Sequence, residues 1–380
     1  ASHYDEGRIT RVLDPDPLWA LLAQRALSRY RDIETHSGVR FYHEVGHLMV
    51  LSAGPAGSEG SKGAGERQRA GGRGSDGEGE RAARVARIAR ELDVVCDTLD
   101  DAELAERFGY LAFEPGAVGY HQPHTAGHVS PRAQVRAQVT AAERRGATVI
   151  PAVVRRVRAD DDHVAVTLAD GAVLRSGRAL VATGGFSNID GLLPRPLDIA
   201  IFARTVVLAE LAASDIERLR GMPSLIYRPR DATPGCYLLP PIRYPDGRWY
   251  LKIGGHTDDH TLHSLPELQE WFRGAGDADA AGHLIDRLST LVPGLRPATY
   301  RTMPCVTTHT PTGHPYAGRL DDGPLGVLTG GNGSAAKSAD ELGRVGALLL
   351  RHDDWVYDIP RERFTVRFAP EERAPAARSR

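Results

Sequence analysis

The chain has 380 residues, of which 41% are hydrophobic and 25% charged, and its formal net charge is −2. This is the composition of a globular protein, and the length predicts two domains or one large domain with an insertion. The small net charge excludes a general attraction to nucleic acid or to an anionic membrane, and no apolar run reaches the 18 residues that a transmembrane helix needs.

The three cysteines, Cys96, Cys236 and Cys305, are odd in number and far apart in the chain. They therefore predict neither a disulfide framework nor a CxxC metal site. No signal peptide is visible at the amino-terminal end of the sequence. We expect a reducing, cytoplasmic setting, no metal site, and a monomer or a homodimer.

The first predicted helix begins at Asp16-Pro17, an N-cap residue followed by a proline, and runs to about His36, where Gly38 stops it. A strand is expected over 41–51, where apolar residues alternate with polar ones. Residues 53–80 include ten glycines in 28 positions and cannot bury a core, so we expect a disordered insertion. A regulatory or partner-binding loop and a tolerated surface insertion are both compatible with this composition.

The clearest supersecondary pattern lies between residues 129 and 183. A helix is expected to begin at Ser130-Pro131 and to end at about Gly146. A three-stranded meander follows, and the apolar run R-A-L-V-A-T-G-G then predicts a buried strand that ends in a glycine pair. The expected strands are 148–158, 163–168, 172–175 and 178–185. This succession of helix, meander and buried strand is typical of nucleotide-binding domains of flavoproteins.

The second half of the chain begins with strands and continues with helices. Residues 200–260 are rich in strand signals separated by proline and glycine turns, which predicts an antiparallel sheet. Helices are expected over about 265–274 and 278–291. The tail after Phe368 consists largely of Pro, Ala, Glu and Arg, and we expect it to be disordered.

The stretch T-G-G-N-G-S, residues 329–334, follows a short buried strand and precedes a helix with an apolar face. Such a helix start presents free N–H groups and the positive end of the helix dipole. These groups suit an anion or the electron-rich edge of a reduced flavin. A tight strand-to-helix turn that needs small residues explains the glycines equally well.

Two further clusters contain reactive side chains. In M-P-C-V-T-T-H-T-P-T-G-H-P, residues 303–315, Cys305 lies among hydroxyls and histidines, although a buried structural role is commoner for such a cysteine. In R-I-T-R, Arg8 and Arg11 are three residues apart and are expected on one side of a helical turn. Two guanidinium groups placed there can clamp a carboxylate, and solvated arginines are the alternative.

Lysine is rare, because Lys62, Lys252 and Lys337 are the only lysines among 47 Lys and Arg residues. Lys62 falls in the expected insertion. Lys252 falls in an expected strand, within W-Y-L-K-I-G-G-H, and Lys337 in the first turn of the helix after the glycine loop, where a cation is unfavourable. A lysine kept in an arginine-rich sequence indicates a need for a compact ammonium, although a strand lysine that reaches water also explains Lys252.

Five stretches together resemble the sarcosine oxidase branch of the FAD-dependent amine oxidases, which belongs to the D-amino acid oxidase superfamily and includes N-methyltryptophan oxidase. In chain order they are S-H-Y-D-E-G-R-I-T-R, A-T-G-G-F-S-N, Y-L-K-I-G-G-H, M-P-C-V-T-T-H-T-P-T-G-H and G-G-N-G-S-A-A-K. The resemblance covers roughly residues 1–350, apart from the insertion.

The resemblance implies an α/β (α+β) fold with two domains and a tail. One is a discontinuous FAD-binding, Rossmann-like domain made of 1–35, 129–199 and 300–360. The other is a substrate domain with a mixed, largely antiparallel sheet. It comprises 36–128 and 200–299, and the tail is 361–380.

The resemblance also implies a role for each matching residue. Cys305 matches the cysteine that bonds covalently to the flavin, and Lys252 matches the lysine held beside the flavin where dioxygen is reduced. Arg11 and Lys337 match the pair that binds the substrate carboxylate. The remaining matches are catalytic Arg8, Tyr237 and His256, and FAD-binding Ser2, His3, Thr183, Gly184, Gly330, Gly331, Asn332, Gly333, Ser334 and Lys337.

These roles imply an FAD-dependent oxidase that converts a secondary or N-methyl amino acid, or a related amine, to an imine and hydrogen peroxide. An ammonium group near the flavin would stabilise the superoxide that forms when dioxygen accepts an electron. The implied partners are a small-molecule amine or amino acid and dioxygen, with no nucleic acid and no membrane.

The sequence departs from the family pattern in three places. The family begins with a βαβ unit that carries GxGxxG, and the printed chain starts just after it, so we expect a fragment or a wrongly placed start. Asn332 and Ser334 differ from the usual Ser and His, and Gly7 differs from Thr, which predicts a changed substrate pocket. The alternatives are a dehydrogenase with a non-oxygen acceptor and a non-catalytic flavoprotein-like protein.

Overall fold

The computed structural model describes residues 4–52, 78–160, 163–230, 234–255 and 260–370. Most of the segment expected to be a disordered insertion, 53–80, lies outside these residues. Its last three residues belong to helix α3 (Glu78–Glu91), so the prediction of disorder was wrong for Glu78–Glu80. One face of α3 packs against the core through Val85, Ile88 and Ala89, which are buried.

An eight-stranded sheet is the largest element, with the strand order β15-β11-β14-β13-β12-β3-β5-β4. Its neighbours pair antiparallel except for β12 and β3, which pair parallel. The antiparallel sheet predicted over 200–260 is therefore confirmed. Its strands are β3 (His47–Ser52), β4 (Asp97–Leu99), β5 (Ala117–Gln122), β11 (Ala200–Glu210), β12 (Ser224–Arg228), β13 (Cys236–Arg243), β14 (Trp249–Gly255) and β15 (Tyr300–His309).

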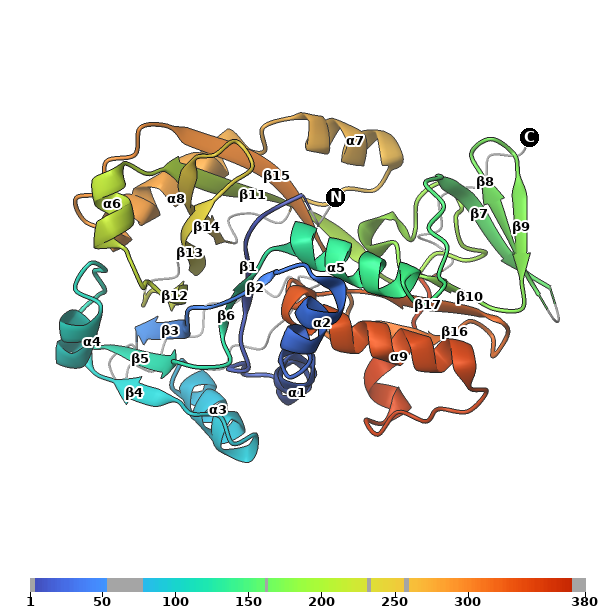
Figure 1. The fold of residues 1–380 in the computed structure, drawn as a ribbon, viewed down its shortest axis with the longest axis horizontal. Coiled ribbons are helices and arrows are strands. Elements are labelled where there is room, and N and C mark those ends of the chain that lie inside the picture. Colours follow the sequence, from blue (N-terminus) through green and yellow to red (C-terminus); the bar gives the residue numbers. More distant parts are fainter. Residues whose placement is uncertain (1–3, 53–77, 161–162, 231–233, 256–259, 371–380) are drawn as a thin grey trace, which may run out of the picture.

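Helices cover one face of this sheet over its first three strands, β15, β11 and β14 (Figure 1). The two helices predicted there are confirmed as α7 (Leu265–Arg273) and α8 (Ala278–Leu291). Each begins after an N-cap residue, because the side chains of Ser264 and Asp277 accept backbone N–H bonds of the first turn. The short helix α4 (Asp101–Arg107) lies at the other end of the sheet, against β4 and β5, and α6 (Ala213–Arg218) lies beside α8, where Arg218 donates to the carbonyl of Pro293.

Three small sheets complete the fold, each with three strands. The first is β1-β6-β2, with β1 (Arg8–Thr10), β6 (Gly127–Val129) and β2 (Tyr42–Glu44). The second is β10-β17-β16, with β10 (Ala179–Val181) parallel to β17 (Leu325–Thr329) and β16 (Tyr316–Arg319) antiparallel to it. The third is the predicted meander, with β7 (Val154–Ala159), β8 (Val164–Leu168) and β9 (Val173–Ser176).

The first strand of the meander is shorter than predicted. It begins at Val154, not at residue 148, and Val149, Ile150 and Val153 are exposed outside any strand. The sequence around these side chains has the apolar pattern of a strand, but the side chains are exposed. Burial against a neighbouring layer is what stabilises a strand of this kind.

The predicted first helix is two helices, α1 (Pro17–Leu27) and α2 (Tyr30–Ser37), so the prediction of one continuous helix was wrong. At the break, Arg29 binds the carboxylates of Asp340 and Glu341, and the buried Tyr30 ring packs edge-on against Phe41. Tertiary contacts therefore override the local helical pattern. The remaining helices are α5 (Pro131–Glu143) and α9 (Ala339–Arg351), with 3-10 turns η1 (Gly184–Phe186), η2 (Ala335–Ser338) and η3 (Arg361–Phe364).

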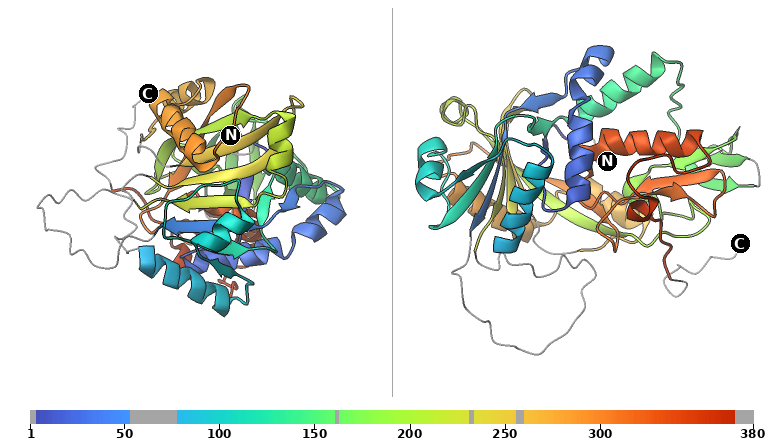
Figure 2. Two further views of the ribbon diagram at one scale, coloured as in Figure 1. Left: turned by 90° about the vertical axis from the view of Figure 1, so that its left-hand side faces the viewer. Right: turned by 90° about the horizontal axis from the view of Figure 1, so that it is seen from below.

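The overall arrangement is a mixed α/β fold, which confirms the predicted class. Figure 1 shows the large sheet on one side and the sheets of β7–β9 and β10, β17 and β16 on the other, with α1, α2, α5 and α9 between them. Figure 2 shows the same separation from below. The long strands β11 and β15 pair along their length and bridge the two regions, so β15 belongs to the large sheet. The sequence-based domain boundary at residue 300 stays a prediction.

Two observations concern the ends of the described chain and its surface. Turn η3 lies in the segment that was expected to be tail, and its Phe364 is fully buried against Trp355 and Tyr357. Among the described helices, none combines the length and the apolar character needed to cross a membrane.

Candidate active site

A cavity of about 260 Å³ lies where β1, the ends of β11–β15 and the loop before η2 meet. Strand β1 and the residue after it bring Arg8 and Arg11 to this point, β15 brings the cysteine, and η2 brings a lysine. Eight predicted site residues line the cavity: Arg8, Arg11, Tyr237, Cys305, Asn332, Gly333, Ser334 and Lys337.

Lys252 lies on β14 beside this cavity and is fully buried. Its ammonium group donates hydrogen bonds to the carboxylate of Asp5 and, over 2.9 Å, to the carbonyl of Gly7. The same carboxylate accepts the Tyr244 hydroxyl over 2.8 Å and forms an ion pair with Arg8. We call Asp5, Arg8 and Lys252 the Lys252 triad. The interpretation of Lys252 as a strand lysine that reaches water is wrong.

The charge state of Lys252 depends on opposing influences. Burial and the nearby Arg8 guanidinium lower its pKa well below the ordinary value. The nearby Cys305 side chain opposes this shift. The ring of Tyr237, whose centroid is 5.7 Å from the ammonium nitrogen, adds a favourable cation–π contact.

A second group, which we call the Lys337 triad, consists of Arg11, Asp14 and Lys337. The Oδ2 atom of Asp14 accepts hydrogen bonds from Arg11 Nη1 over 3.0 Å and from Lys337 Nζ over 2.5 Å. Burial raises the pKa of Asp14, but Lys337 and Arg11 outweigh it and hold the pKa well below its usual range. Burial and Arg11 lower the pKa of Lys337 to about 8.

The two predicted arginines are not on a helical turn, so that expectation was wrong. Arg8 belongs to strand β1, which pairs antiparallel with β6, and Arg11 follows directly after it. The extended backbone separates their side chains, and each arginine pairs with an aspartate three residues away in sequence. They therefore serve two different triads and do not form one clamp.

Cys305 is a free, half-buried thiol on β15 whose side chain lines the cavity. Its backbone pairs with Arg204 of β11, and the indole Nε1–H of Trp271 donates to its carbonyl over 2.9 Å. The Arg8 Nη2 atom lies 3.7 Å from the sulfur. Cys305 is thus anchored on both sides, with its sulfur presented to the cavity beside a cation.

The glycine loop before η2 is tightly packed. Gly330 has φ +77°, and a Cβ atom there would lie 2.3 Å from a methyl carbon of Thr310. The Asn332 side-chain oxygen accepts the Thr310 backbone N–H over 2.9 Å, and the backbone N–H of Asn332 donates to the Thr308 carbonyl over 2.7 Å. These contacts support the tight-turn interpretation of the glycines. Lys337 was expected in the first turn of the helix after the glycine loop, but it lies in the 3-10 turn η2, before α9.

Other predicted site residues lie elsewhere or outside the described chain. Thr183 and Gly184 follow β10, where the Gly184 carbonyl accepts the Thr329 hydroxyl over 3.2 Å. Gly331 packs against Ala335 at the start of η2. Residues Ser2, His3 and His256 lie outside the described residues.

Sequence reasoning missed the two aspartates that bind the lysines. Asp5 and Asp14 lie 247 and 323 residues from their lysine partners in sequence, so a local sequence pattern does not predict these contacts. The available signal was the repeated spacing of an aspartate and an arginine three residues apart. Sequence reasoning also missed Tyr244, whose hydroxyl completes the surroundings of Asp5.

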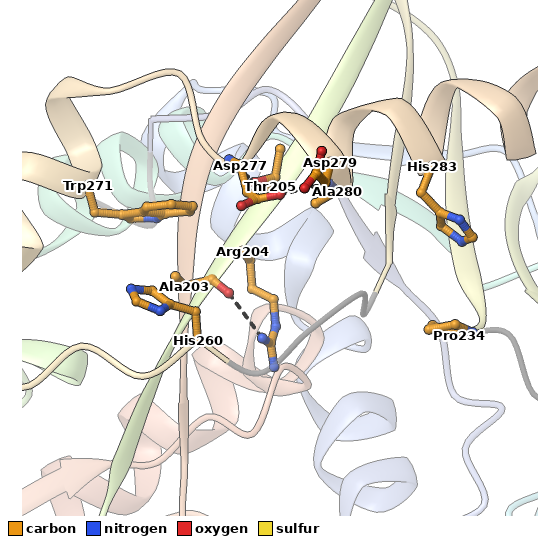
Figure 3. Close-up of a pocket in the computed structure, with 10 residues that line it drawn as sticks. All are labelled: Ala203, Arg204, Thr205, Pro234, His260, Trp271, Asp277, Asp279, Ala280 and His283. Atoms are coloured by element: carbon orange, nitrogen blue, oxygen red, sulfur yellow. Dashed lines mark hydrogen bonds between the residues drawn. The ribbon is translucent and has the colours of Figure 1, made fainter.

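A second cavity, of about 460 Å³, lies between β11 and the helices α7 and α8. Figure 3 shows Asp277 near the start of α8, with Trp271 and His283 at opposite ends of the cavity. Arg204 extends away from α8, and both Arg204 and Thr205 also line the first cavity. Among the described residues, no cluster of three histidine, cysteine or acidic side chains could hold a metal ion.

The walls of the first cavity suit a planar aromatic ring with polar edges. Apolar side chains from four strands or their neighbours line it, namely Ile9, Met49, Val206 and Ile226. The ring of Tyr237 lies against Gly254, where any side chain would displace it, because a Cβ atom would be 2.4 Å from the Tyr237 hydroxyl. Apolar walls with a few convergent polar groups are typical of cofactor sites. The residues present therefore fit the isoalloxazine ring of a flavin.

Comparison with solved structures supports the same fold. NikD, an unusual amino acid oxidase essential for nikkomycin biosynthesis, is 21% identical with a TM-score of 0.73, over 96% of this chain and 87% of that one. Glycine oxidase from Geobacillus kaustophilus is 16% identical with a TM-score of 0.70, over 96% and 88%. Amadoriase I, the fructosyl amine:oxygen oxidoreductase from Aspergillus fumigatus, is 19% identical with a TM-score of 0.64, over 92% and 77%.

At these identities the structural likeness establishes the fold and not the substrate. No curated protein sequence matches the chain. A family model described as FAD dependent oxidoreductase (DAO) matches residues 1–349, which is most of the chain. The chain therefore belongs to the DAO family of FAD-dependent oxidoreductases.

Proposed function

We propose that this FAD-dependent amine or amino acid oxidoreductase is an oxidase of a secondary or N-methyl amine or amino acid. The reaction removes two electrons and two protons from the C–H and N–H of the amine, giving an imine, and passes them to dioxygen, giving hydrogen peroxide. Water then hydrolyses the imine to an aldehyde and an amine.

One observation carries this proposal: a fully buried lysine, Lys252, in a chain that otherwise uses arginine almost throughout. A buried ammonium near the site where dioxygen is reduced stabilises the developing negative charge far more than it would in water. Because Lys252 is fully buried, it is not a surface charge that interacts with water. We therefore assign to Lys252 the activation of dioxygen.

The flavin, when bound, supplies the two-electron acceptor on which this chemistry depends. The residues that line the cavity would hold the flavin and fix its orientation. Arg8 and Cys305 line the cavity beside Lys252, and we propose that the Cys305 thiol would anchor a covalently bound flavin. Burial raises the pKa of Tyr237 to about 12, so its hydroxyl stays protonated and can donate a hydrogen bond into the cavity. Arg11 and Lys337 form the end of the cavity that receives the substrate.

The proposal is tested with the flavin-loaded, full-length protein. Addition of an N-methyl amine under anaerobic conditions should bleach the flavin absorbance, and admission of air should restore it with one hydrogen peroxide formed per turnover. Acid precipitation should leave the pellet yellow if Cys305 holds the flavin, and Cys305→Ala should release the colour to the supernatant. Flavin that no amine reduces would contradict the proposal.

A dehydrogenase that passes electrons to another acceptor is the second candidate, and one observation favours it. The Asp5 carboxylate contacts both Lys252 and Arg8 and cancels one of their two positive charges. A weaker field would stabilise superoxide less. Slow reoxidation by air together with fast reoxidation by an artificial quinone would favour this candidate over the oxidase.

A further inference from the structure

The Lys337 triad contains a carboxylate where the substrate's carboxylate was expected. Asp14 Oδ2 accepts from both Arg11 and Lys337, over 3.0 and 2.5 Å, so one oxygen occupies the position between the two cations. Asp14 is 5% exposed and lines the cavity together with both partners. The protein itself thus supplies the anion that this pair of cations binds.

Asp14 is held in place by the local structure. Its second oxygen, Oδ1, accepts the backbone N–H of Asp16 over 3.0 Å. Asp16 is the N-cap of α1, and Pro15 between them restricts the backbone. Turning Asp14 out of the cavity would leave a buried lysine, a partly buried arginine and a backbone donor without this acceptor, which is costly.

The remaining charge of the triad is small. Two cations and one carboxylate leave one positive charge, and a second carboxylate entering between them would lie beside Asp14, where like charges repel. The adjoining wall is apolar, because Ile9 and Met49 line the same cavity. Other arginines of the cavity, Arg81, Arg204 and Arg228, are engaged in interactions of their own.

Resting on the proposed function, we propose that Asp14 is a specificity-determining residue that replaces the substrate carboxylate. The substrate is then a secondary or N-methyl amine whose group facing Arg11 and Lys337 is uncharged, and not an α-amino acid bound through its carboxylate.

The test compares two ligands that differ only in this charge, N-methylglycine and N-methylglycinamide. Their dissociation constants are measured with the flavin-loaded protein under anaerobic conditions, from the perturbation of the flavin spectrum and from the shift in unfolding temperature. We expect the wild-type protein to bind the amide at least about 10-fold more tightly, and Asp14→Asn to reverse the preference to at least about 10-fold in favour of the carboxylate. A wild-type protein that does not favour the amide, or a ratio that Asp14→Asn leaves unchanged, overturns the proposal.

Two control variants separate the effect of the Asp14 charge on the binding ratio from other causes of a changed ratio. In Asp14→Asn/Lys337→Met the gain in carboxylate affinity should disappear, since one cation is gone. In Asp340→Asn, which removes a carboxylate that binds Arg29 and Gln138 outside the cavity, the ratio should stay at its wild-type value. If Asp14→Asn does not fold, the wild-type ratio alone decides the question.

The result also remains distinct from the test of the proposed function. The binding ratio is measured without turnover, so it stands even if neither compound reduces the flavin. Conversely, reduction by an N-methyl amine with a strong preference for carboxylates would support the oxidase and reject the role of Asp14.

Discussion

The two buried lysine triads have the same composition and different surroundings. In each, an aspartate pairs with an arginine three residues away and with a distant lysine, leaving one net positive charge. Lys252 is enclosed within the large sheet, whereas Lys337 lies on a 3-10 turn and lines the cavity. The Lys252 triad therefore forms the proposed oxygen site, and the Lys337 triad, with the same arrangement of charges, faces the proposed substrate.

The difference in surroundings appears in the protonation of the two lysines. Burial and an arginine lower both pKa values, to about 8 for Lys337 and well below the ordinary value for Lys252. Lysine suits a buried position at which the side chain can gain or lose its proton. Arginine does not, since it keeps its proton at any physiological pH. Four changes to the protein or its solution test whether the two triads differ in this way.

Removal of either aspartate charge should have the largest effect on stability. Asp5→Asn and Asp14→Asn each leave a buried lysine and a partly buried arginine without their carboxylate, and we expect a loss of about 3–5 kcal/mol in the free energy of unfolding. Chemical denaturation measures this loss. The control is Glu6→Gln, next to Asp5 in sequence, whose carboxylate binds the exposed Arg132 and should cost much less. A loss at Asp5 no greater than at Glu6 would contradict the pairing with Lys252.

Alkaline pH should stabilise the protein through Lys337. In the folded protein Lys337 releases its proton at about pH 8, but in the unfolded chain only near its ordinary pKa. Between these values the unfolded chain binds more protons, so the free energy of unfolding rises with pH, by up to about 3 kcal/mol from this group. The rise, measured by denaturation from pH 8 to 10.5, should be smaller by this amount in Lys337→Met, which keeps the contribution of Lys252, whose pKa is also lowered. An identical pH profile in that variant would refute the assignment.

Exchange of lysine for arginine should distinguish the two surroundings. Lys252→Arg inserts a larger group into a fully enclosed position and should cost about 1–3 kcal/mol in the free energy of unfolding. Lys337→Arg has the cavity beside it and should cost less. The two unfolding curves measured in parallel test this order, and equal losses would mean that the two sites are equally enclosed.

The smallest effect concerns the hydroxyl that donates to Asp5. Tyr244→Phe removes a buried hydrogen bond to a charged group, worth about 1.5 kcal/mol. Tyr250→Phe is the matched control, because its hydroxyl binds Asp246 near the surface and should matter less. Denaturation midpoints that shift equally in the two variants would argue against a special role for the Asp5 contact.

Local sequence rules predicted the elements that have local causes. The cap residues Asp16 and Ser130 marked the starts of two helices correctly, because a cap acts within one turn. The alternation around Val149 predicted strand where none exists, because burial against a facing layer was missing. The break at Arg29 depends on carboxylates in α9 and was invisible in the local pattern.

The candidate site followed a similar division. The scarcity of lysine drew attention to Lys252 and Lys337, and both are buried with ionic partners. Their partners Asp5 and Asp14 are contacts of the tertiary fold, which one sequence does not reveal. The roles implied for Cys305 and the other matched residues stay predictions.

The reoxidation rate of the reduced flavin tests the central claim most directly. The full-length, flavin-loaded protein is reduced anaerobically with dithionite and mixed with oxygenated buffer in a stopped-flow instrument, alongside Lys252→Met and Lys337→Met. The account predicts reoxidation at least about 100-fold slower in Lys252→Met and nearly unchanged in Lys337→Met. Equal rates in the wild-type protein and Lys252→Met would contradict it.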